Sequence, residues 1–224
     1  GLVLAQAIQP GLPFFMGGVL SVMDMSAMIL SYGAPELSLM MAGATELAHY
    51  AGIPLWQTGG CTDSKILDEQ AAIEGSLSCF FSALTGGDLC HDVGYTESGI
   101  TGSILQTVMM DEAIGYSRRI TRGIEVNQDT LATDIIHSVG PDGDYLNEEH
   151  TMKHSKTEFW YPNLCDRHNF EEWEEAGQKP MRDSVVERTK EILSSHKPSP
   201  IKPETEKAIK AIMEAAEKRV QDKP

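Results

Sequence analysis

The stretch IPLWQTGGCTDSKILDEQAAIEGSLSCFFSALTGGDLCHDVGY, residues 53–95, contains two short apolar runs that each lead into a glycine turn. Between the turns, apolar residues recur at the spacing of one helix face. They are Ile66, Ile73, Leu77, Phe80, Phe81 and Leu84. Gly86 and Gly87 follow, as glycine does at the end of a helix. The stretch therefore predicts parallel strands at residues 53–57 and 88–93, joined by a helix.

Similar units lie on both sides of this stretch. An apolar run at residues 13–20 precedes an expected helix from Pro35 to Gly52, and a third helix is expected at about residues 101–120. Three consecutive βα units without G-x-G-x-x-G favour a barrel over a dinucleotide-binding fold. A complete barrel needs about 250 residues. We therefore expect an α/β fold, the C-terminal half of a (β/α)8 TIM barrel followed by a helical C-terminal extension.

Two regions are expected. Residues 1–125 would form βα units of the second half of the barrel, and residues 126–224 the remaining barrel helices, an irregular wrapping segment and C-terminal helices. The opening GLVLAQAIQPG is typical of the end of a helix, so we expect the protein to begin upstream. In the second region the expected elements are a helix at residues 130–139, irregular chain at 145–180, a helix opened by a capping box of Ser184 and Glu187, a linker at 195–203 and a final helix.

The composition is that of a globular protein, with 41% hydrophobic residues and a net charge of −15 over 224 residues. This acidity excludes a nucleic-acid-binding protein, which needs concentrated positive charge. Residues 1–117 hold 12 acidic residues and one basic residue, Lys65. Such a field favours a cationic ligand, although acidic surfaces also serve solubility alone.

The apolar stretch at residues 11–30 is interrupted by Pro13, two glycines and Asp24, and it lacks the flanking basic residues of a signal peptide. It is better explained as a core strand and loop, so no membrane association is expected. The four cysteines form no C-x-x-C pair. Without a secretion signal, free thiols indicate a cytoplasmic protein.

Chemistry in a barrel takes place at the carboxyl ends of the strands and in the loops that follow. The rule selects residues 16–18, 56–63 and 91–97. His91 is the candidate catalytic residue because Asp92, Tyr95 and Glu97 follow closely, although a strand-end histidine is also often a core residue. The candidate substrate-binding residues at these strand ends are Met16, Trp56, Gln57, Asp92, Gly94, Tyr95 and Glu97.

The aromatic residues at the strand ends suggest a cage for a quaternary ammonium group, held by cation–π attraction. Trp56 and Tyr95 would form it together with Phe14, Phe15 or Tyr32. Aromatic residues at such positions are more often part of the core, so both interpretations stay open.

No metal is expected. Cys61, Cys90 and His91 lie on neighbouring strand ends, but Cys90 and His91 are adjacent and point to opposite faces of a strand. His150 and His154 are spaced i, i+4, but without the H-E-x-x-H position of a general base. A structural or interface role is favoured for that pair. G-x-S-x-G, P-loop and kinase motifs are absent from the sequence.

Several separate segments resemble one known family, the trimethylamine methyltransferase (MttB-like) family of corrinoid-dependent methyltransferases. They are GLVLAQAIQPG (residues 1–11), HDVGYTESGITGS (91–103), YLNEEHTMKHSKTEFWYPNLCDR (145–167) and FEEWEEAG (170–177). The resemblance extends from residue 1 to about residue 193, and it implies a TIM barrel of roughly twice this length. The family's archetype uses pyrrolysine, whereas the strand-end segment LCHDVGYTESG here contains standard residues.

The resemblance implies transfer of a methyl group from a quaternary amine, glycine betaine first of all, to Co(I) of a corrinoid. The cobalamin or corrinoid would be supplied by a cognate corrinoid protein and not bound covalently here. Aromatic residues with Asp92 or Glu97 would hold the ammonium group, and His91 would orient the substrate or contact its carboxylate. The alternatives are demethylation of trimethylamine or of another methylated amine such as carnitine or proline betaine, and a non-catalytic ligand-binding barrel. Unpaired strand edges make a homo-oligomer a further expectation.

Overall fold

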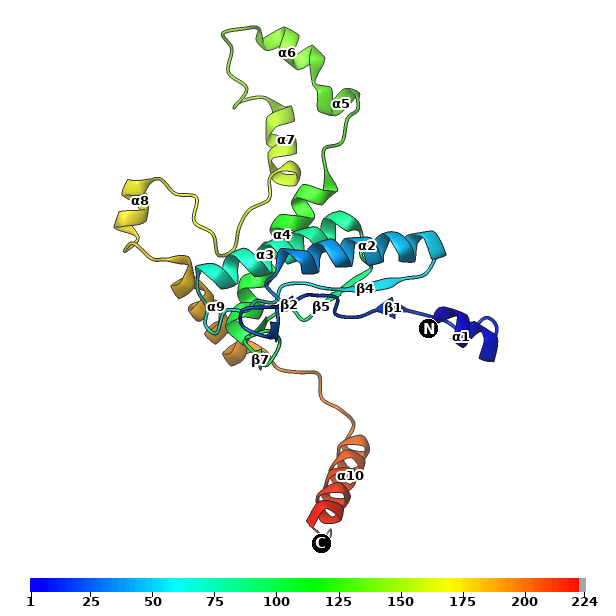
Figure 1. Cartoon of the computed structure of the whole chain (residues 1–224). Coiled ribbons are helices and arrows are strands. Elements are labelled where there is room, and N and C mark those ends of the chain that lie inside the picture. Colours follow the sequence, from blue (N-terminus) through cyan, green and yellow to red (C-terminus); the bar gives the residue numbers. More distant parts are fainter. Residues whose placement is uncertain (222–224) are drawn as a thin grey trace. The chain divides into compact units, whose positions relative to one another are not determined.

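The computed structural model describes residues 1–221 and contains two compact units, Gly1–Thr189 and a second unit that begins at Lys190. The first unit is a mixed α/β structure built on a small parallel sheet (Figure 1). Its strands are β1 (Met16–Gly17), β4 (Leu55–Thr58) and β5 (Leu89–His91), in the order β1-β4-β5. All three predicted strands are therefore confirmed as parallel neighbours, and each is shorter than its apolar run.

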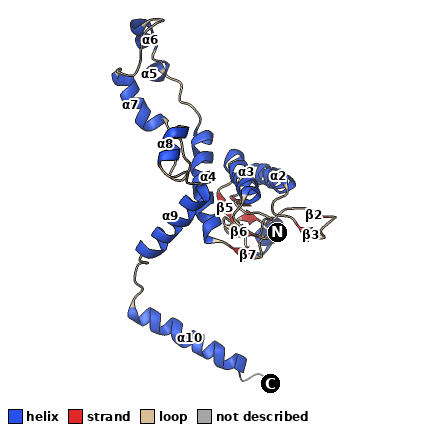
Figure 2. Cartoon of the chain, turned by 90° about the vertical axis from the view of Figure 1, so that its left-hand side faces the viewer, coloured by secondary structure: helices blue, strands red, loops and turns tan. Residues whose placement is uncertain are grey.

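Three long helices connect and follow these strands: α2 (Pro35–Ala51), α3 (Glu69–Thr85) and α4 (Ile104–Arg122). The predicted helix ends are confirmed, because Gly52 and Gly86 both adopt the left-handed conformation, with φ of 63° and 77°. At the other ends, the side chains of Asp68 and Ser103 accept hydrogen bonds from the first turns of α3 and α4. Both views place α2 and α3 along the same side of the sheet (Figures 1 and 2).

Two antiparallel hairpins lie in the loops at the carboxyl ends of the sheet. β2 (Met23–Asp24) pairs with β3 (Ile29–Leu30) between β1 and α2, and β6 (Tyr95–Thr96) pairs with β7 (Thr101–Gly102) between β5 and α4. The sequence analysis did not predict either hairpin. They give ordered backbone to the two loops that follow the outer strands.

The core of the first unit consists of two clusters of buried side chains. The cluster between α2 and β4 contains Leu37, Met41, Ala44, Ala48 and Leu55. The cluster around α3 and α4 contains Ala71, Cys79, Met109, Met110, Leu164 and Val185. The two helices approach closely at Gly75, where a Cβ atom would lie 2.5 Å from Sδ of Met110. The absence of a side chain at Gly75 therefore permits the close packing of α3 against α4.

The second half of the first unit departs from the sequence expectations. Its helices are α5 (Gln128–Leu131), α6 (Thr133–Val139), α7 (Glu149–Glu158), α8 (Phe170–Glu175) and the start of α9 (Met181–Ser195). The helix expected at residues 130–139 is confirmed apart from a break: the left-handed Ala132, with φ of 49°, separates α5 from α6. The irregular segment expected at residues 145–180 in fact contains α7 and α8.

The capping box expected at Ser184 and Glu187 is also wrong. α9 begins at Met181, directly after Pro180, which places Ser184 inside the helix. The first unit begins with the short helix α1 (Leu2–Ile8), and the second unit contains α10 (Pro203–Gln221), a helix of 19 residues. The predicted linker is confirmed, since residues 196–202 form no helix. Among residues 1–221, no helix has both the length and the apolar character needed to cross a bilayer.

Candidate functional site

The carboxyl ends of β1, β4 and β5 lie at one edge of the sheet because the strands are parallel. The register pairs Gly17 with Trp56, and Thr58 with His91. Side chains two residues apart on a strand share a face, so Trp56 and Thr58 project from the same face of β4. Three predicted segments, residues 16–18, 56–63 and 91–97, are thereby brought together, as the sequence indicated.

The centre of this edge is a pair of rings. The centroids of the Trp56 and His91 rings are 3.8 Å apart, with their planes inclined at 58°. The indole lies over Gly17, where a Cβ atom would come within 1.5 Å of Nε1 of Trp56. Any side chain at position 17 would therefore displace the tryptophan, so this glycine provides close approach and not only a turn.

Both ring nitrogens of His91 have protein partners. Nδ1 lies 2.8 Å from Oδ1 of Asp92, and Nε2 lies 3.1 Å from Oγ1 of Thr58. Asp92 itself adopts a left-handed backbone conformation, with φ of 66°, which is uncommon for a residue with a side chain. The imidazole is thus held in one orientation against the indole.

The loops after β4 and β5 are joined by backbone hydrogen bonds. The N–H of Gly59 donates to the carbonyl of His91 at 3.1 Å, and the N–H of Gly94 donates to Gly60 at 3.0 Å. Gly94 has φ of 97°, and a Cβ atom there would lie 2.0 Å from Oγ1 of Thr107. The structure therefore gives the predicted binding residue Gly94 a role in packing the loop against α4.

A carboxylate that the sequence analysis did not single out ties all three loops together. Oδ1 of Asp63 accepts hydrogen bonds from the backbone N–H of Tyr32 and the hydroxyl of Ser98, both at 2.8 Å. Its Oδ2 accepts the hydroxyl of Ser31. These partners lie 31 to 35 residues away in the chain. The available signal was the position of Asp63 at the end of residues 56–63, one of the three segments that follow the predicted strands.

Asp63 is in turn held by Glu74 of α3. Oε2 of Glu74 accepts hydrogen bonds from the backbone N–H of Asp63 at 2.9 Å and from the hydroxyl of Thr62 at 2.5 Å. The carboxylate also fills the space beside Gly33, where a Cβ atom would lie 2.3 Å from it. Glu74 thus anchors the loop that carries Asp63 to the first half of α3.

Tyr32, Cys61 and Asp92 lie near one another beneath these loops. Burial, followed by the charge of Asp92, raises the pKa of Tyr32 and raises that of Cys61 to about 12. Cys61 is fully buried, so it stays a neutral thiol near pH 7. The structure does not gather Cys61, Cys90 and His91 as zinc ligands: among the described residues the group with suitable spacing lies elsewhere, and Cys90 and His91 point to opposite faces of β5.

Other predicted residues lie apart from the ring pair. Gln57 is buried on the helix side of the sheet, where Nε2 donates to Oγ1 of Thr45 in α2 and of Thr85 in α3. Met16 packs against the α2–β4 cluster. Of the further predicted cage residues, Phe14 lies against Gly1, and Phe15 and Tyr95 are exposed.

The predicted residue Glu97 sits in the loop between β6 and β7. Its carboxylate accepts a hydrogen bond from the hydroxyl of Thr101 at 2.9 Å, and its backbone is left-handed with φ of 53°. Its side chain therefore braces the hairpin next to the strand ends. Together with Asp63 and Asp92 it gives this edge a negative charge.

Cys79 of α3 and Cys90 of β5 meet on the helix side of the sheet. A hydrogen bond from the Cys79 thiol lowers the pKa of Cys90 to about 7, while that contact and burial raise the pKa of Cys79. We expect iodoacetamide to alkylate Cys90 first, with a rate midpoint near pH 7 instead of the usual value near 8.5. Peptide mass spectrometry across a pH series measures this rate.

The control for this prediction removes the donor. In Cys79→Ala the midpoint for Cys90 should rise toward the ordinary thiol value, because its thiolate loses the hydrogen bond that stabilises it. A midpoint at the ordinary value in the unmodified protein would contradict the prediction.

The strand-end geometry lies in a chain that matches a known family over the whole of its described length. A family model described as trimethylamine methyltransferase (MTTB) covers residues 1–221. The chain belongs to the trimethylamine methyltransferase family. The resemblance noted from residues 1–11, 91–103, 145–167 and 170–177 is confirmed.

Individual relatives of this family carry two kinds of name. The trimethylamine methyltransferase MttB of Desulfitobacterium hafniense (strain DSM 10664 / DCB-2) is 36% identical over 216 residues, 96% of this chain and 43% of the relative. The glycine betaine methyltransferase of Desulfitobacterium hafniense (strain Y51) is 32% identical over 222 residues, which are 98% of this chain and 46% of the relative. The trimethylamine methyltransferase MttB of Methanosarcina barkeri (strain Fusaro / DSM 804) is 31% identical over 221 residues, 97% and 44%. The chain therefore spans less than half the length of these methyltransferases.

Proposed function

We propose that this member of the trimethylamine methyltransferase family transfers a methyl group from a quaternary amine, glycine betaine first of all, to Co(I) of a separate corrinoid protein. The observation that carries the proposal is the Trp56 ring at the carboxyl edge of the sheet, fixed by Gly17 and His91. An aromatic face with carboxylates nearby is the environment that a quaternary ammonium group prefers. Asp92 and Glu97 supply such carboxylates.

The proposed architecture is the second half of a (β/α)8 barrel. Both outer strands of the sheet, β1 and β5, have one edge free of pairing within the described residues. Such edges favour pairing with further strands, and the relatives are more than twice as long as this chain. Barrel strands from the other half would then supply the opposite wall of the binding pocket, with the ring pair at the face where barrel enzymes act.

The proposed reaction requires little acid–base catalysis from these residues. The methyl group leaves nitrogen without the C–N electron pair and passes to the corrinoid, so the amine departs neutral and needs no proton. This chain's part is to position the ammonium group on Trp56, to exclude water and to balance the positive charge. The two ring nitrogens of His91 are held by Asp92 and Thr58. His91 therefore orients the substrate through contacts with its ring.

A second candidate is demethylation of trimethylamine, favoured by the name of the relative at 36% identity. Trimethylamine is protonated near neutral pH and so presents a cation to the same ring. Methyl transfer from the protonated amine releases neutral dimethylamine, so this substrate must keep its proton until the methyl group has left, whereas a quaternary amine has no proton to lose. The standard residues at 89–99 favour the quaternary substrate.

The test is a cobalamin assay with the whole protein in which this chain occurs. Cob(I)alamin is mixed with protein and glycine betaine, and loss of the Co(I) absorbance is followed beside a protein-free control. Carnitine, proline betaine, choline and trimethylamine are run in parallel. We expect rapid loss with glycine betaine. Loss with trimethylamine alone would support the second candidate, and no loss with any amine in folded protein would overturn the proposal and leave a ligand-binding barrel.

The remaining expectations follow from this function. The partner would be the cognate corrinoid protein, and the free strand edges also favour a homo-oligomer. All four cysteines are free thiols, which agrees with a cytoplasmic location.

A further inference from the structure

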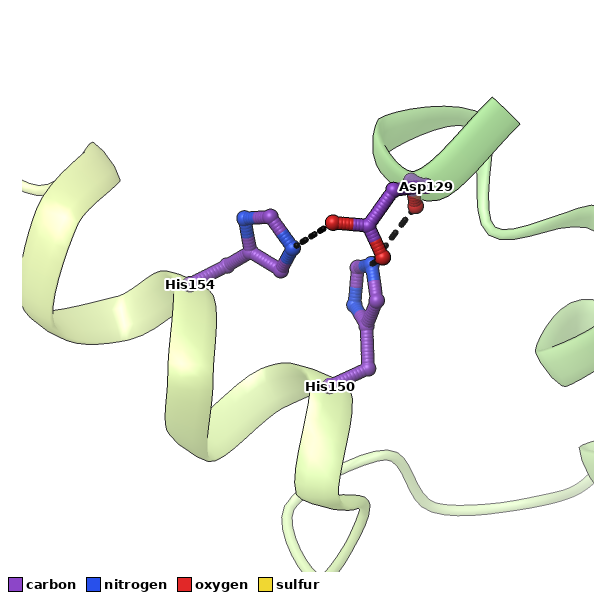
Figure 3. Close-up of side chains that lie close together, drawn as sticks. All are labelled: Asp129, His150 and His154. Carbon is purple, nitrogen blue, oxygen red and sulfur yellow. Dashed lines mark hydrogen bonds and ion pairs between the residues drawn. The ribbon is translucent and has the colours of Figure 1, made fainter. Parts of the chain in front are cut away.

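A second cluster of chemically capable side chains lies outside the sheet, in the segment that projects beyond the end of α4 (Figure 1). α7 carries His150 and His154 one helical turn apart, and their ring centroids are 4.1 Å apart. Figure 3 shows both rings directed at Asp129, which comes from α5. Two histidines and a carboxylate from separate segments therefore converge on one point.

The distances among these groups suit a shared metal ion. Nε2 of His154 lies 3.2 Å from Oδ2 of Asp129, and Nε2 of His150 lies 3.9 Å from Oδ1. One ligand atom from each residue can be chosen so that all three lie within 4.8 Å of one another. In tetrahedral zinc sites with bonds of about 2.0–2.1 Å, neighbouring ligand atoms are separated by about 3.3 Å. The separation between His154 and Asp129 matches that value, and the one between His150 and Asp129 exceeds it by about 0.6 Å.

We propose that Asp129, His150 and His154 bind one Zn²⁺ ion. Two imidazole nitrogens and one carboxylate oxygen form a donor set that zinc commonly takes, with water in the fourth position. The sequence analysis favoured a structural or interface role for the two histidines, because they lack the H-E-x-x-H position of a general base. Asp129, 21 residues before His150, supplies it in the folded chain.

Two existing contacts must be exchanged when the ion enters. Nε2 of His150 lies 2.7 Å from the backbone oxygen of Asp129, and Nζ of Lys153 lies 2.7 Å from Oδ2. The lysine side chain is 63% exposed, so its ammonium group can return to water when the divalent ion replaces it. Nε2 of His150 must leave the backbone oxygen for a metal ion held by the carboxylate, whose Oδ1 lies 3.9 Å away.

The ion would strengthen the connection between α5 and α7, which is otherwise made by the contacts of Asp129 with Lys153 and the two histidines. α5 is a single turn of four residues, closed by its own capping box of Asn127 and Thr130. α7 is tied at its far end to α4, where Arg119 donates to the carbonyl of Glu158 at 2.8 Å. A metal between α5 and α7 would close the loop formed by residues 130–149 and so restrict the unfolded chain.

The experiment measures Zn²⁺ binding to the full chain after removal of metal with a chelator. Isothermal titration with ZnCl₂ should give one ion per chain in the wild type. His154→Ala and Asp129→Asn should each weaken the affinity by roughly 100-fold, because each removes a ligand. The matched control is His137→Ala in α6, a histidine outside the cluster, which should bind as the wild type does. Equal binding by the wild type and His154→Ala, or no binding by a folded wild type, would overturn the proposal.

A further variant separates a metal site from a simple network of ion pairs. Lys153→Met removes the cation that competes for Asp129 but leaves all three ligands, so it should bind Zn²⁺ at least as tightly as the wild type. Limited proteolysis adds a readout independent of affinity, since Zn²⁺ should slow cleavage within residues 130–149 in this variant and not in His154→Ala. Weaker zinc binding by Lys153→Met would show that the lysine, and not a metal, completes the cluster.

Discussion

Trp56→Ala is expected to lower kcat/KM for methyl transfer from glycine betaine by roughly 30-fold. A desolvated cation–π contact contributes about 2 kcal/mol, and each 1.36 kcal/mol changes a rate about tenfold. The substitution also frees the His91 ring, which packs against the indole at a centroid distance of 3.8 Å. The cobalamin assay measures the rate, and circular dichroism verifies that the variant is folded.

Two controls separate recognition of the cation from general packing. Trp56→Phe keeps a ring with a weaker negative face, so its rate should fall between those of the wild type and Trp56→Ala. Trp173→Phe changes a tryptophan of α8, whose Nε1 donates to Lys179, and should leave kcat/KM unchanged. A rate within about twofold of the wild type in folded Trp56→Ala would contradict a role for the ring in binding the ammonium group.

Glu112→Ala is expected to destabilise the first unit by about 3 kcal/mol, the range for stranding buried hydrogen-bond partners of a charged group. Glu112 is only 5% exposed, and its Oε1 accepts the backbone N–H groups of Asn163, Leu164 and Cys165 at 3.0 to 3.1 Å. Without it the N–H of Leu164, the buried residue of the three, loses its acceptor within the cluster around α3 and α4. For a domain of this size we expect Tm to fall by roughly 10 °C, measured by thermal unfolding.

Glu46→Ala is the matched control, since it removes an exposed glutamate of α2 and should change stability by less than about 0.5 kcal/mol. Glu112→Gln keeps an oxygen acceptor, so its Tm should lie between those of Glu112→Ala and Glu46→Ala. Equal melting of the Glu112→Ala and Glu46→Ala proteins would show that residues 163–165 find other acceptors.

The fold of the first half could be predicted because its signals are local. Apolar runs gave the three strands, and glycines at positions 52 and 86 gave the ends of α2 and α3. The second half carries weaker signals: α7 is mostly polar, and nothing in the composition of residues 130–139 indicated a left-handed Ala132. The pattern at Ser184 resembled a helix start, but Pro180 already permits one earlier.

The sequence predicted which residues meet at the strand ends, but not the hydrogen bonds that hold the surrounding loops. Strand alternation was enough to bring Trp56 and His91 to one edge, yet the partners of Asp63 are contributed by loops more than 30 residues away. Glu112 likewise binds backbone 51 to 53 residues further on. Such contacts depend on how loops and helices pack, which periodicity does not encode. The side of the sheet on which Gln57 lies could have been predicted from strand alternation. Its neighbour Trp56 faces the strand-end site, so Gln57 faces the helices.

The carboxylate of Asp63 has a mechanical consequence for the loops that surround the ring pair. Because one side chain joins Ser31, Tyr32 and Ser98, a displacement of any of the three loops is transmitted to the other two. The three loops therefore move together when a ligand binds. The entropic cost of ordering these loops arises during folding and not at each binding event. In the proposed barrel, entry and exit of a bulky ligand would therefore depend on motion of the opposite wall, while the loops joined by Asp63 keep their positions.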